Sequence, residues 1–196
     1  MITGLYFGSF NPIHIGHLAI ANYIIEFSDL EQLWFVVSPQ NPLKEKKSLL
    51  KDYHRLEMVR LAIQEDERFR ASDIEFRLPT PSYTIDTLAY LEEKNPGSEF
   101  QLVMGADGLR TFSKWKHAKL IAEKYHRLIY PRPGADLAAA SLLPNATVVE
   151  APLMEISSSF IRRAIHEGKD IRHLMPAAAY DYMREMHFYE KKNSDR

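Results

Sequence analysis

Two histidines near the N-terminus are the side chains in this sequence best suited to chemistry. His14 and His17 stand three positions apart in the segment Gly8–His17, which reads Gly-Ser-Phe-Asn-Pro-Ile-His-Ile-Gly-His. Imidazoles hold a phosphate as neutral donors, and they take up charge when negative charge develops in a transition state. Gly8 lets a ligand approach the backbone closely, and Ser9 adds a hydroxyl donor. The segment therefore predicts a site for a phosphate group.

The place of this segment in the chain supports the same prediction. It lies between an expected strand, Ile2–Gly8, and an expected helix that begins at Gly16 and His17. Ligands bind at the carboxyl edge of an open parallel sheet, and the first N–H groups of a helix favour an anion. Two alternatives stay open, a partial metal site without a third ligand nearby and a pair of ordinary surface histidines. Neither a Walker phosphate loop nor a G-x-G-x-x-G fingerprint follows the first strand.

Three serines before an amphipathic stretch form a second candidate. The segment Ile156–Arg163 reads Ile-Ser-Ser-Ser-Phe-Ile-Arg-Arg. Serines at such a place are commonly N-caps, and that alternative stays open. Arg162 follows Ser158 by one turn on the same face of the helix, so hydroxyls, a guanidinium and a helix N-terminus could converge on a polyphosphate.

A third candidate closes an expected strand. The segment Leu102–Asp107 ends with Gly105 and Asp107, which suit hydrogen bonding to a ribose. An N-capping role for Asp107 is the alternative.

The elements that must position these residues alternate along the chain. Short β-rich runs that end in Gly, Pro or Ser are followed by amphipathic stretches, which is typical of a parallel sheet with crossover helices. The expected strands are Ile2–Gly8, Leu33–Ser38, Phe69–Ser72, Phe100–Gly105, Arg127–Tyr130 and Thr147–Glu150. The expected helices are His17–Phe27, Tyr53–Glu65 and one opening at the N-cap Thr84 and closing at Asn95-Pro-Gly. We predict an α/β fold with a Rossmann-like open, mainly parallel sheet and helices on both faces, in a single domain over 1–189, with a disordered tail at 190–196.

Composition excludes several classes of protein. The chain has 196 residues, 25 Lys+Arg and 26 Asp+Glu, a net charge of −1 and no cysteine. The charge argues against binding to nucleic acid through overall charge, and the missing cysteine excludes disulfides and a thiol nucleophile. The longest strongly apolar run, Leu33–Val37, is far shorter than the roughly 20 residues that span a bilayer. No signal-peptide pattern opens the chain, so a cytoplasmic location is expected.

A long loop is expected after the second strand. The segment Pro39–Lys47 holds two prolines and a cluster of charge. The loop over 39–51 could be a substrate lid, and a solvated basic loop is the alternative.

Motifs along nearly the whole chain resemble a known family. The chain is similar to the H-x-G-H nucleotidyltransferases, which share this element with class I aminoacyl-tRNA synthetases, and within them to bacterial nicotinate-nucleotide adenylyltransferases. The motifs that carry the resemblance are Gly8–His17, Asn41-Pro-Leu-Lys44, Arg55-Leu-Glu-Met-Val59, the segment Asp73–Leu88, the segment Gly105–Trp115 and Ile156–Arg162.

The resemblance implies that the phosphate of nicotinate mononucleotide attacks the α-phosphorus of ATP, giving deamido-NAD and pyrophosphate without a covalent enzyme intermediate. The residues it implies are, for catalysis, His14, His17, Arg162 and Lys44; for ATP, Gly8, Ser9, Gly105, Asp107, Ser157 and Ser158; and for nicotinate mononucleotide, Thr84, Trp115 and Asn41. Trp115 would stack on the pyridine ring, or it is a half-buried packing aromatic. Mg²⁺ is expected on the ATP phosphates without a protein metal site. Neither nucleic acid nor a membrane is an expected partner, and the oligomeric state stays open.

The sequence departs from the family pattern at four places. Asn11 stands where Asp is usual, Ser9 where Thr is usual, Leu43 where His is usual, and Lys116 where many members have Tyr. Two alternatives remain, another adenylyltransferase such as the phosphopantetheine enzyme, which typically has Thr in place of His14, and a non-catalytic nucleotide-binding module. Pyrophosphate release with a panel of mononucleotides separates them.

Overall fold

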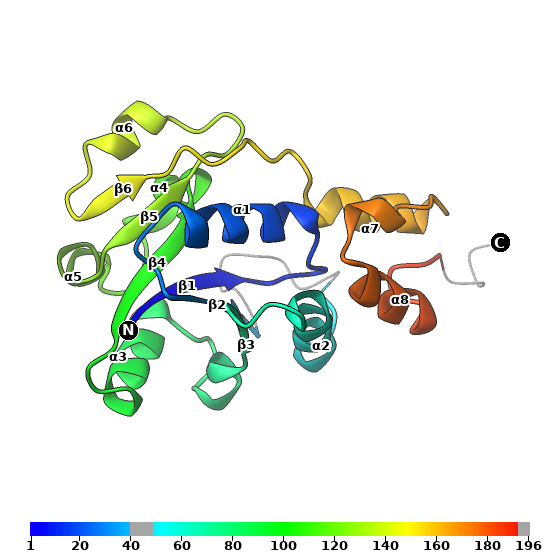
Figure 1. Ribbon diagram of the computed structural model, residues 1–196, viewed down its shortest axis with the longest axis horizontal. Coiled ribbons are helices and arrows are strands. Elements are labelled where there is room, and N and C mark those ends of the chain that lie inside the picture. The colour runs from blue at the N-terminus through cyan, green and yellow to red at the C-terminus, as the bar shows by residue number, and fades with distance from the viewer. Residues whose placement is uncertain (40–48, 192–196) are drawn as a thin grey trace.

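A six-stranded sheet forms the centre of the protein, in the order β3-β2-β1-β4-β5-β6 (Figure 1). The computed structural model describes residues 1–39 and 49–191. Its strands are β1 (Ile2–Gly8), β2 (Gln32–Val37), β3 (Phe69–Ser72), β4 (Glu99–Gly105), β5 (Arg127–Tyr130) and β6 (Ala146–Val148). Each of the five pairings between neighbouring strands is parallel, which confirms the predicted sheet.

Helices cover both faces of the sheet, because the central strands are apolar on both sides. In β2, Leu33, Phe35 and Val37 face one core cluster, whereas Trp34 and Val36 face the other. Such continuous apolar runs are typical of parallel strands buried on both faces. Helices α1 (Ile15–Glu26) and α2 (Asp52–Ile63) pack into the first cluster, and α3 (Thr84–Lys94) and α5 (Ala118–Lys124) pack into the second. The predicted Rossmann-like architecture is confirmed.

The order of the strands fixes where a ligand can bind. The chain runs outward from β1 through β2 to β3, and it returns to the other side of β1 as β4 before continuing to β5 and β6. The crevice at the carboxyl ends of the strands where this direction reverses is the usual ligand site of such folds. Gly8 and Gly105, which end β1 and β4, flank it.

The described residues form four further helices. They are α4 (Leu109–Phe112), α6 (Leu137–Ser141), α7 (Ser158–His166) and α8 (Ala177–Glu185), with 3₁₀ turns at Ile74–Arg77, Ala106–Gly108 and Arg172–Leu174. Sequence analysis did not predict α8, which packs against α2 through a 2.8 Å hydrogen bond between the Tyr182 hydroxyl and His54 Nδ1. Figure 1 shows that α7 and α8 lie side by side at the end of the molecule where α1 begins.

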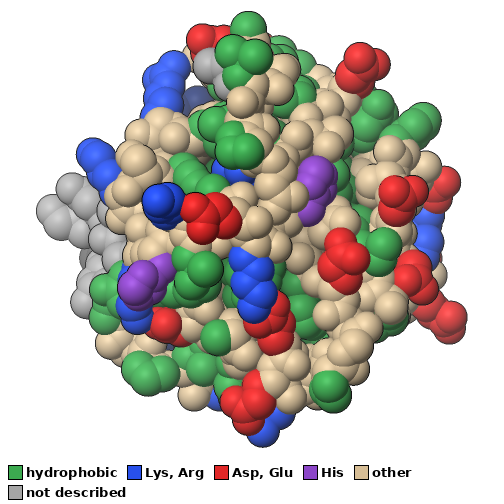
Figure 2. All heavy atoms as spheres, turned by 90° about the vertical axis from the view of Figure 1, so that its left-hand side faces the viewer, with side chains coloured by type: hydrophobic (Ala, Val, Ile, Leu, Met, Phe, Trp, Pro, Cys, Tyr) green, Lys and Arg blue, Asp and Glu red, His purple; other side chains and the backbone are tan. Residues whose placement is uncertain are grey.

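The surface carries mixed charge, and the end of the chain is partly tied down. Figure 2 shows acidic and basic side chains interspersed over one face, as the nearly balanced composition predicts. In the predicted tail, Glu190 forms an ion pair with Arg184 at 2.8 Å, while 192–196 lie outside the described residues. In the ranges 1–39 and 49–191, no helix is long and apolar enough to cross a membrane.

Candidate functional site

Two adjoining cavities open where β1 and β4 end. We call them the histidine pocket, which His14, His17 and Arg162 line, and the tryptophan pocket, which Thr84 and Trp115 line. Their volumes are about 380 and 510 Å³. Both are lined by Tyr6, Phe7, Gly8, Ser9, Asp107 and Tyr130. A ligand with two linked parts could therefore occupy both pockets across the reversal of the sheet order.

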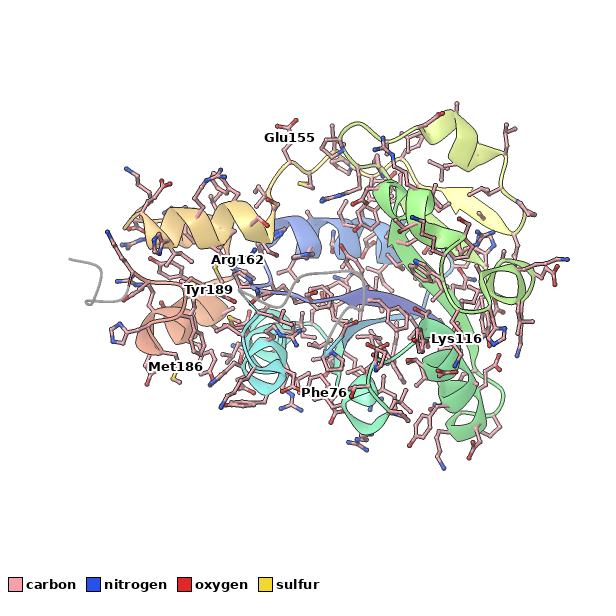
Figure 3. All side chains as sticks on the ribbon, turned by 180° about the vertical axis from the view of Figure 1, so that it is seen from behind. Phe76, Lys116, Glu155, Arg162, Met186 and Tyr189 are labelled. Atoms are coloured by element: carbon pink, nitrogen blue, oxygen red, sulfur yellow. The ribbon has the colours of Figure 1, made fainter. Side chains whose placement is uncertain are left out.

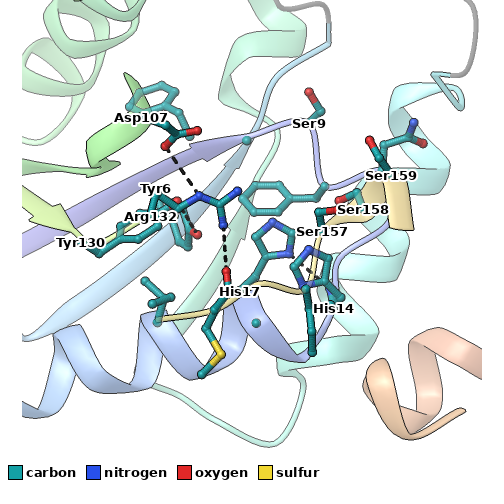
Figure 4. A pocket seen from close by; sticks show the side chains of 18 of the residues that line it. Tyr6, Ser9, His14, His17, Asp107, Tyr130, Arg132, Ser157, Ser158 and Ser159 are labelled. Carbon is teal, nitrogen blue, oxygen red and sulfur yellow. Dashed lines mark hydrogen bonds and ion pairs between the residues drawn. The ribbon is translucent and has the colours of Figure 1, made fainter. Parts of the chain in front are cut away.

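The two histidines belong to the first turn of α1. His14 is the N-cap, with φ −148° and ψ 170°, so the helix begins at Ile15 and not at the predicted His17. The reason is a local hydrogen bond, because the His14 N–H donates to Nδ1 of His17 at 3.2 Å. The two rings stack with centroids 3.8 Å apart, side by side at the helix start (Figure 4).

The protonation of His14 follows from its surroundings. Burial lowers the pKa of His14 to about 4, and the nearby charge of Arg132 acts in the same direction. His14 is therefore neutral near pH 7 and offers a phosphate a hydrogen-bond donor rather than a full charge. A neutral His17 carries its proton on Nε2, because its Nδ1 accepts from the backbone.

The N-terminus of α7 meets the loop after β1. Ser157 is the N-cap, and its hydroxyl accepts from the N–H of Phe160 at 3.2 Å, so the capping role that the sequence left open is confirmed. The hydroxyl of Ser158 donates to the carbonyl of Pro12 at 2.9 Å. Residues that are 146 positions apart in the chain are thereby joined at the wall of the histidine pocket.

Arg162 lies in the same wall, one turn farther along α7. Its guanidinium donates to the carbonyl of Asn11 at 2.8 Å and to the hydroxyl of Ser159 at 3.2 Å. The side chain is half-buried and lines the pocket together with both histidines. The predicted convergence of these groups on one cavity is thus present in the fold.

The end of β4 contributes Asp107, and the segment after β5 contributes Arg132, which sequence analysis missed. Arg132 Nε lies 3.6 Å from Asp107 Oδ1, and the same guanidinium donates to the Met154 carbonyl at 3.5 Å (Figure 4). The cap positions before the 3₁₀ turn and before α4 belong to Gly105 and Gly108, so the alternative that Asp107 is an N-cap is wrong. The sequence could have indicated Arg132 as a site residue, because it stands two residues after the end of β5, at the same edge of the sheet.

Gly105 is required by the closeness of this ion pair. A Cβ at this position would overlap Asp107 Oδ1 and lie 3.0 Å from Arg132 Cγ. A larger residue would displace the exposed Asp107 carboxylate, and the absent side chain lets a ligand reach the backbone.

The tryptophan pocket is closed at one end by the N-terminus of α3. Tyr83 is the N-cap, with φ −118° and ψ 139°, and Thr84 is the first helical residue, so the prediction that Thr84 caps the helix is wrong by one position. Two hydrogen bonds fix the turn at the start of α3. The hydroxyls of Ser82 and Thr87 donate to the buried carboxyl of Glu75 at 3.1 and 3.0 Å. Ser82, Tyr83 and Thr84 line the pocket, so the N-terminus of α3, where the first N–H groups of a helix lack intrahelical partners, borders it.

Glu75 is a second residue whose role sequence analysis did not recognise. Burial raises the pKa of its carboxyl, and hydrogen bonds from Ser38, Thr87 and Ser82 act against this rise. The side chain ties the end of β2 to the start of α3. It therefore supports the pocket from beneath.

Trp115 and Lys116 line the same pocket beside the start of α3. Trp115 is half-buried, with its ring centroid 5.3 Å from that of Phe112, so it both packs and lines the pocket. Lys116 donates to both carboxylate oxygens of Asp86, at 3.0 and 2.9 Å, and its Nζ lies 4.9 Å from the centre of the Tyr83 ring. A charged side chain that covers Tyr83 thus stands where the family often has an aromatic one.

Two predicted site residues cannot be placed. Asn41 and Lys44, with Leu43 and most of the predicted lid over 39–51, lie outside the described residues. The described chain does show how the segment is flanked. Arg55, which is 0% exposed, donates to four carbonyls, those of Ser9 at 2.6 Å, Ser38 at 2.8 Å, Leu50 at 2.9 Å and Pro39 at 3.1 Å. Its motif was recognised in the sequence but not its function.

No cluster of metal ligands stands in the site. Within the part of the chain that the structure describes, no three His, Asp or Glu side chains come together to hold a metal ion. The histidine pocket instead presents N–H, hydroxyl and guanidinium groups, which suit anionic oxygens.

Comparison with known proteins gives the family. The Cytidylyltransferase-like family model matches residues 5–164. A protein of Flavobacterium johnsoniae described as a probable nicotinate-nucleotide adenylyltransferase is 49% identical over 97% of this chain and 100% of its own length. One of Bacteroides fragilis with the same description is 49% identical over 91% of this chain and 89% of its own.

Solved structures share the fold. Nicotinic acid mononucleotide adenylyltransferase of Plasmodium falciparum complexed with NaAD superposes with a TM-score of 0.79 at 21% identity, covering 96% of this chain and 97% of that one. The same protein complexed with APC gives a TM-score of 0.77 at 19% identity, covering 96% of each chain. With curated relatives nearly half identical over nearly its whole length, the chain belongs to the nicotinate-nucleotide adenylyltransferases of the Cytidylyltransferase-like family.

Proposed function

We propose that this protein transfers the adenylyl group of ATP to nicotinate mononucleotide, giving deamido-NAD and pyrophosphate. The observation that carries the proposal is the pair of adjoining pockets. One is lined by two histidines and an arginine that suit phosphates, and the other by a helix N-terminus and a tryptophan that suit an aromatic carboxylate. The descriptions of the curated relatives agree with it.

In this proposal the histidine pocket holds the triphosphate. His14, His17 and Arg162 stabilise the charge that develops on the leaving pyrophosphate, and Ser9 donates a further hydrogen bond. Transfer of this kind needs positioning and charge stabilisation more than a protein nucleophile, which agrees with the absence of cysteine. The family resemblance also assigns an assisting role to Lys44, which lies outside the described residues.

The adenosine lies across the shared wall. Gly105 and Asp107 contact the ribose, and Ser157 and Ser158 stand near the adenylate. Arg132 joins this group, because it pairs with Asp107 and lines the histidine pocket. The mononucleotide lies in the tryptophan pocket, where Thr84 and Trp115 hold the nicotinate and Asn41 contributes from the loop.

Mg²⁺ enters with ATP as part of the substrate. The donors that face the histidine pocket are N–H, hydroxyl and guanidinium groups, and Asp107, the one carboxylate among the described residues of the shared wall, is paired with Arg132. This set fits an ion coordinated by phosphate oxygens and water.

The test is pyrophosphate release from ATP and Mg²⁺ with a panel of mononucleotides. We expect release with nicotinate mononucleotide and formation of deamido-NAD. Release with phosphopantetheine instead would replace this function with that of another family member. Absence of release with every acceptor would indicate a nucleotide-binding module without catalysis.

The acid is expected to be preferred over the amide. A nicotinate carboxylate meets the positive end of α3 and its N–H donors, whereas the amide brings an uncharged NH₂ to the same donors. We expect kcat/KM for nicotinate mononucleotide to exceed that for the amide by about 100-fold, a few kcal/mol. Because backbone N–H groups carry the preference, Trp115→Ala should lower both values and leave their ratio unchanged. Equal kcat/KM for acid and amide would contradict this assignment.

Arg162 is expected to require its planar guanidinium. Lysine keeps the charge but lacks the planar fork that can bind a phosphate in a bidentate way while it also donates to the Asn11 carbonyl, so Arg162→Lys should lower kcat/KM for ATP about tenfold. The matched control is Arg163→Lys, because Arg163 is exposed and lies about 100° round the helix. Steady-state kinetics with varied ATP measures both. Full activity of Arg162→Lys would show that Arg162 is only structural.

A further inference from the structure

The C-terminal segment reaches the loop that carries the histidines. Tyr189, four residues beyond the end of α8, has φ 64°, and its hydroxyl donates to Oδ1 of Asn11 at 2.6 Å. The N–H of Leu50 donates to the same oxygen at 3.3 Å. The side chain of Asn11, which is 5% exposed, is thus held from two distant parts of the chain.

The backbone of Asn11 contacts a different partner from its side chain, Arg162 on α7. Its carbonyl accepts the 2.8 Å hydrogen bond from Arg162 that turns this guanidinium along the wall of the histidine pocket. Figure 3 shows Arg162 and Tyr189 close to one another, at the end of the molecule where α7 and α8 lie. Asn11 therefore joins the Tyr189 hydroxyl to the Arg162 guanidinium.

The surroundings of Tyr189 keep its hydroxyl a donor. Burial raises the pKa of Tyr189 far above its usual range, and the positive charges of Arg162 and Arg55 lower it by less. The residues on either side are also fixed. The Phe188 ring lies 4.6 Å from that of His54 on α2, and Glu190 pairs with Arg184 at 2.8 Å.

From this geometry we infer that Tyr189 is a positioning residue for the ATP phosphates, acting through Asn11 on Arg162. The inference rests on the proposed function, because it assigns the phosphate site to ATP. Losing the hydroxyl removes the shorter of the two hydrogen bonds to Asn11 Oδ1 and so loosens the residue whose carbonyl orients Arg162. A small displacement of a charge-stabilising group lowers the rate strongly, because catalysis depends on position.

The test compares two variants, each of which loses one tyrosine hydroxyl. Tyr189→Phe should lower kcat/KM for ATP about tenfold and change KM for nicotinate mononucleotide by less than twofold. Tyr182→Phe is the matched control, since its hydroxyl also ties α8 to the core, through His54, but contacts nothing in either pocket. We expect it to lose as much thermal stability as Tyr189→Phe and to keep its kinetics.

Two further variants separate positioning from a general structural effect. Asn11→Ala should reproduce the loss of Tyr189→Phe, and in an Arg162→Ala background Tyr189→Phe should have no additional effect on ATP. Equal kinetics of Tyr189→Phe and Tyr182→Phe, or full additivity with Arg162→Ala, would overturn the inference.

The same variants distinguish this inference from the proposed function. Wild-type protein that releases no pyrophosphate would overturn the function alone. Calorimetric titration with MgATP would then decide the inference, with about tenfold weaker binding by Tyr189→Phe supporting it and unchanged binding overturning it.

Discussion

Replacing His17 with alanine should lower kcat about 10²–10³-fold, the usual effect of removing one preorganised donor from a developing charge. The ring lies at the N-terminus of α1, stacked 3.8 Å from His14, and its Nδ1 accepts from the backbone, which directs the proton to Nε2. Alanine removes that donor and the hydrogen bond from the His14 N–H to Nδ1, which is worth about 1 kcal/mol, so the fold should persist. Pyrophosphate release at saturating substrates, scaled to the folded fraction from circular dichroism, measures the effect.

The matched control is His166→Ala. His166 is exposed in the last turn of α7, and neither pocket contains it, so its removal should leave kcat unchanged. A folded His17→Ala protein that turns over like the wild type would refute the assignment of the histidine pocket to the reacting phosphates.

Replacing Arg55 with leucine should lower the free energy of unfolding by about 3 kcal/mol or more. Leucine leaves the carbonyls of Ser9, Ser38, Pro39 and Leu50 without their donor, and each buried carbonyl that loses its partner costs about 1–3 kcal/mol. Relief from burying the guanidinium charge offsets part of this sum. Urea denaturation gives the value.

Arg60→Leu is the control for Arg55, on the same helix. Its side chain is 56% exposed and pairs with Glu57 at 3.6 Å, so the change in stability should stay within about 0.5 kcal/mol. Arg55→Lys should fall between the two, because one ammonium cannot bond to four carbonyls. If Arg55→Leu were as stable as Arg60→Leu, the buried guanidinium would not hold the loops together.

Features with a local cause were predictable. The bounds of β1, β3 and β5 match the predicted runs, because apolar residues that end in Gly, Ser or Pro mark a strand within a few positions. Ser157 as N-cap was predictable for the same reason, since a cap bonds to a backbone group three residues away. The start of α1 was misplaced because histidine is not an ordinary capping residue, and its bond to His17 forms only in the folded turn.

The residues that support the site were not predictable in the same way. Glu75 and Arg132 act on partners far along the chain or across strands. A motif can mark such residues, as it did Arg55, but it does not show which groups they touch.

The sequence by itself determined the succession of the strands, the helices α1, α2, α3 and α7 and the types of residue at the strand ends, because hydrophobic periodicity, turn residues and caps act over a few positions. Only the tertiary structure decided that Tyr189 meets Asn11 and that Arg162 turns along the wall beside two histidines. Those contacts join residues 178 and 151 positions apart, and they form only when the sheet order and the packing of α7 and α8 bring the segments together.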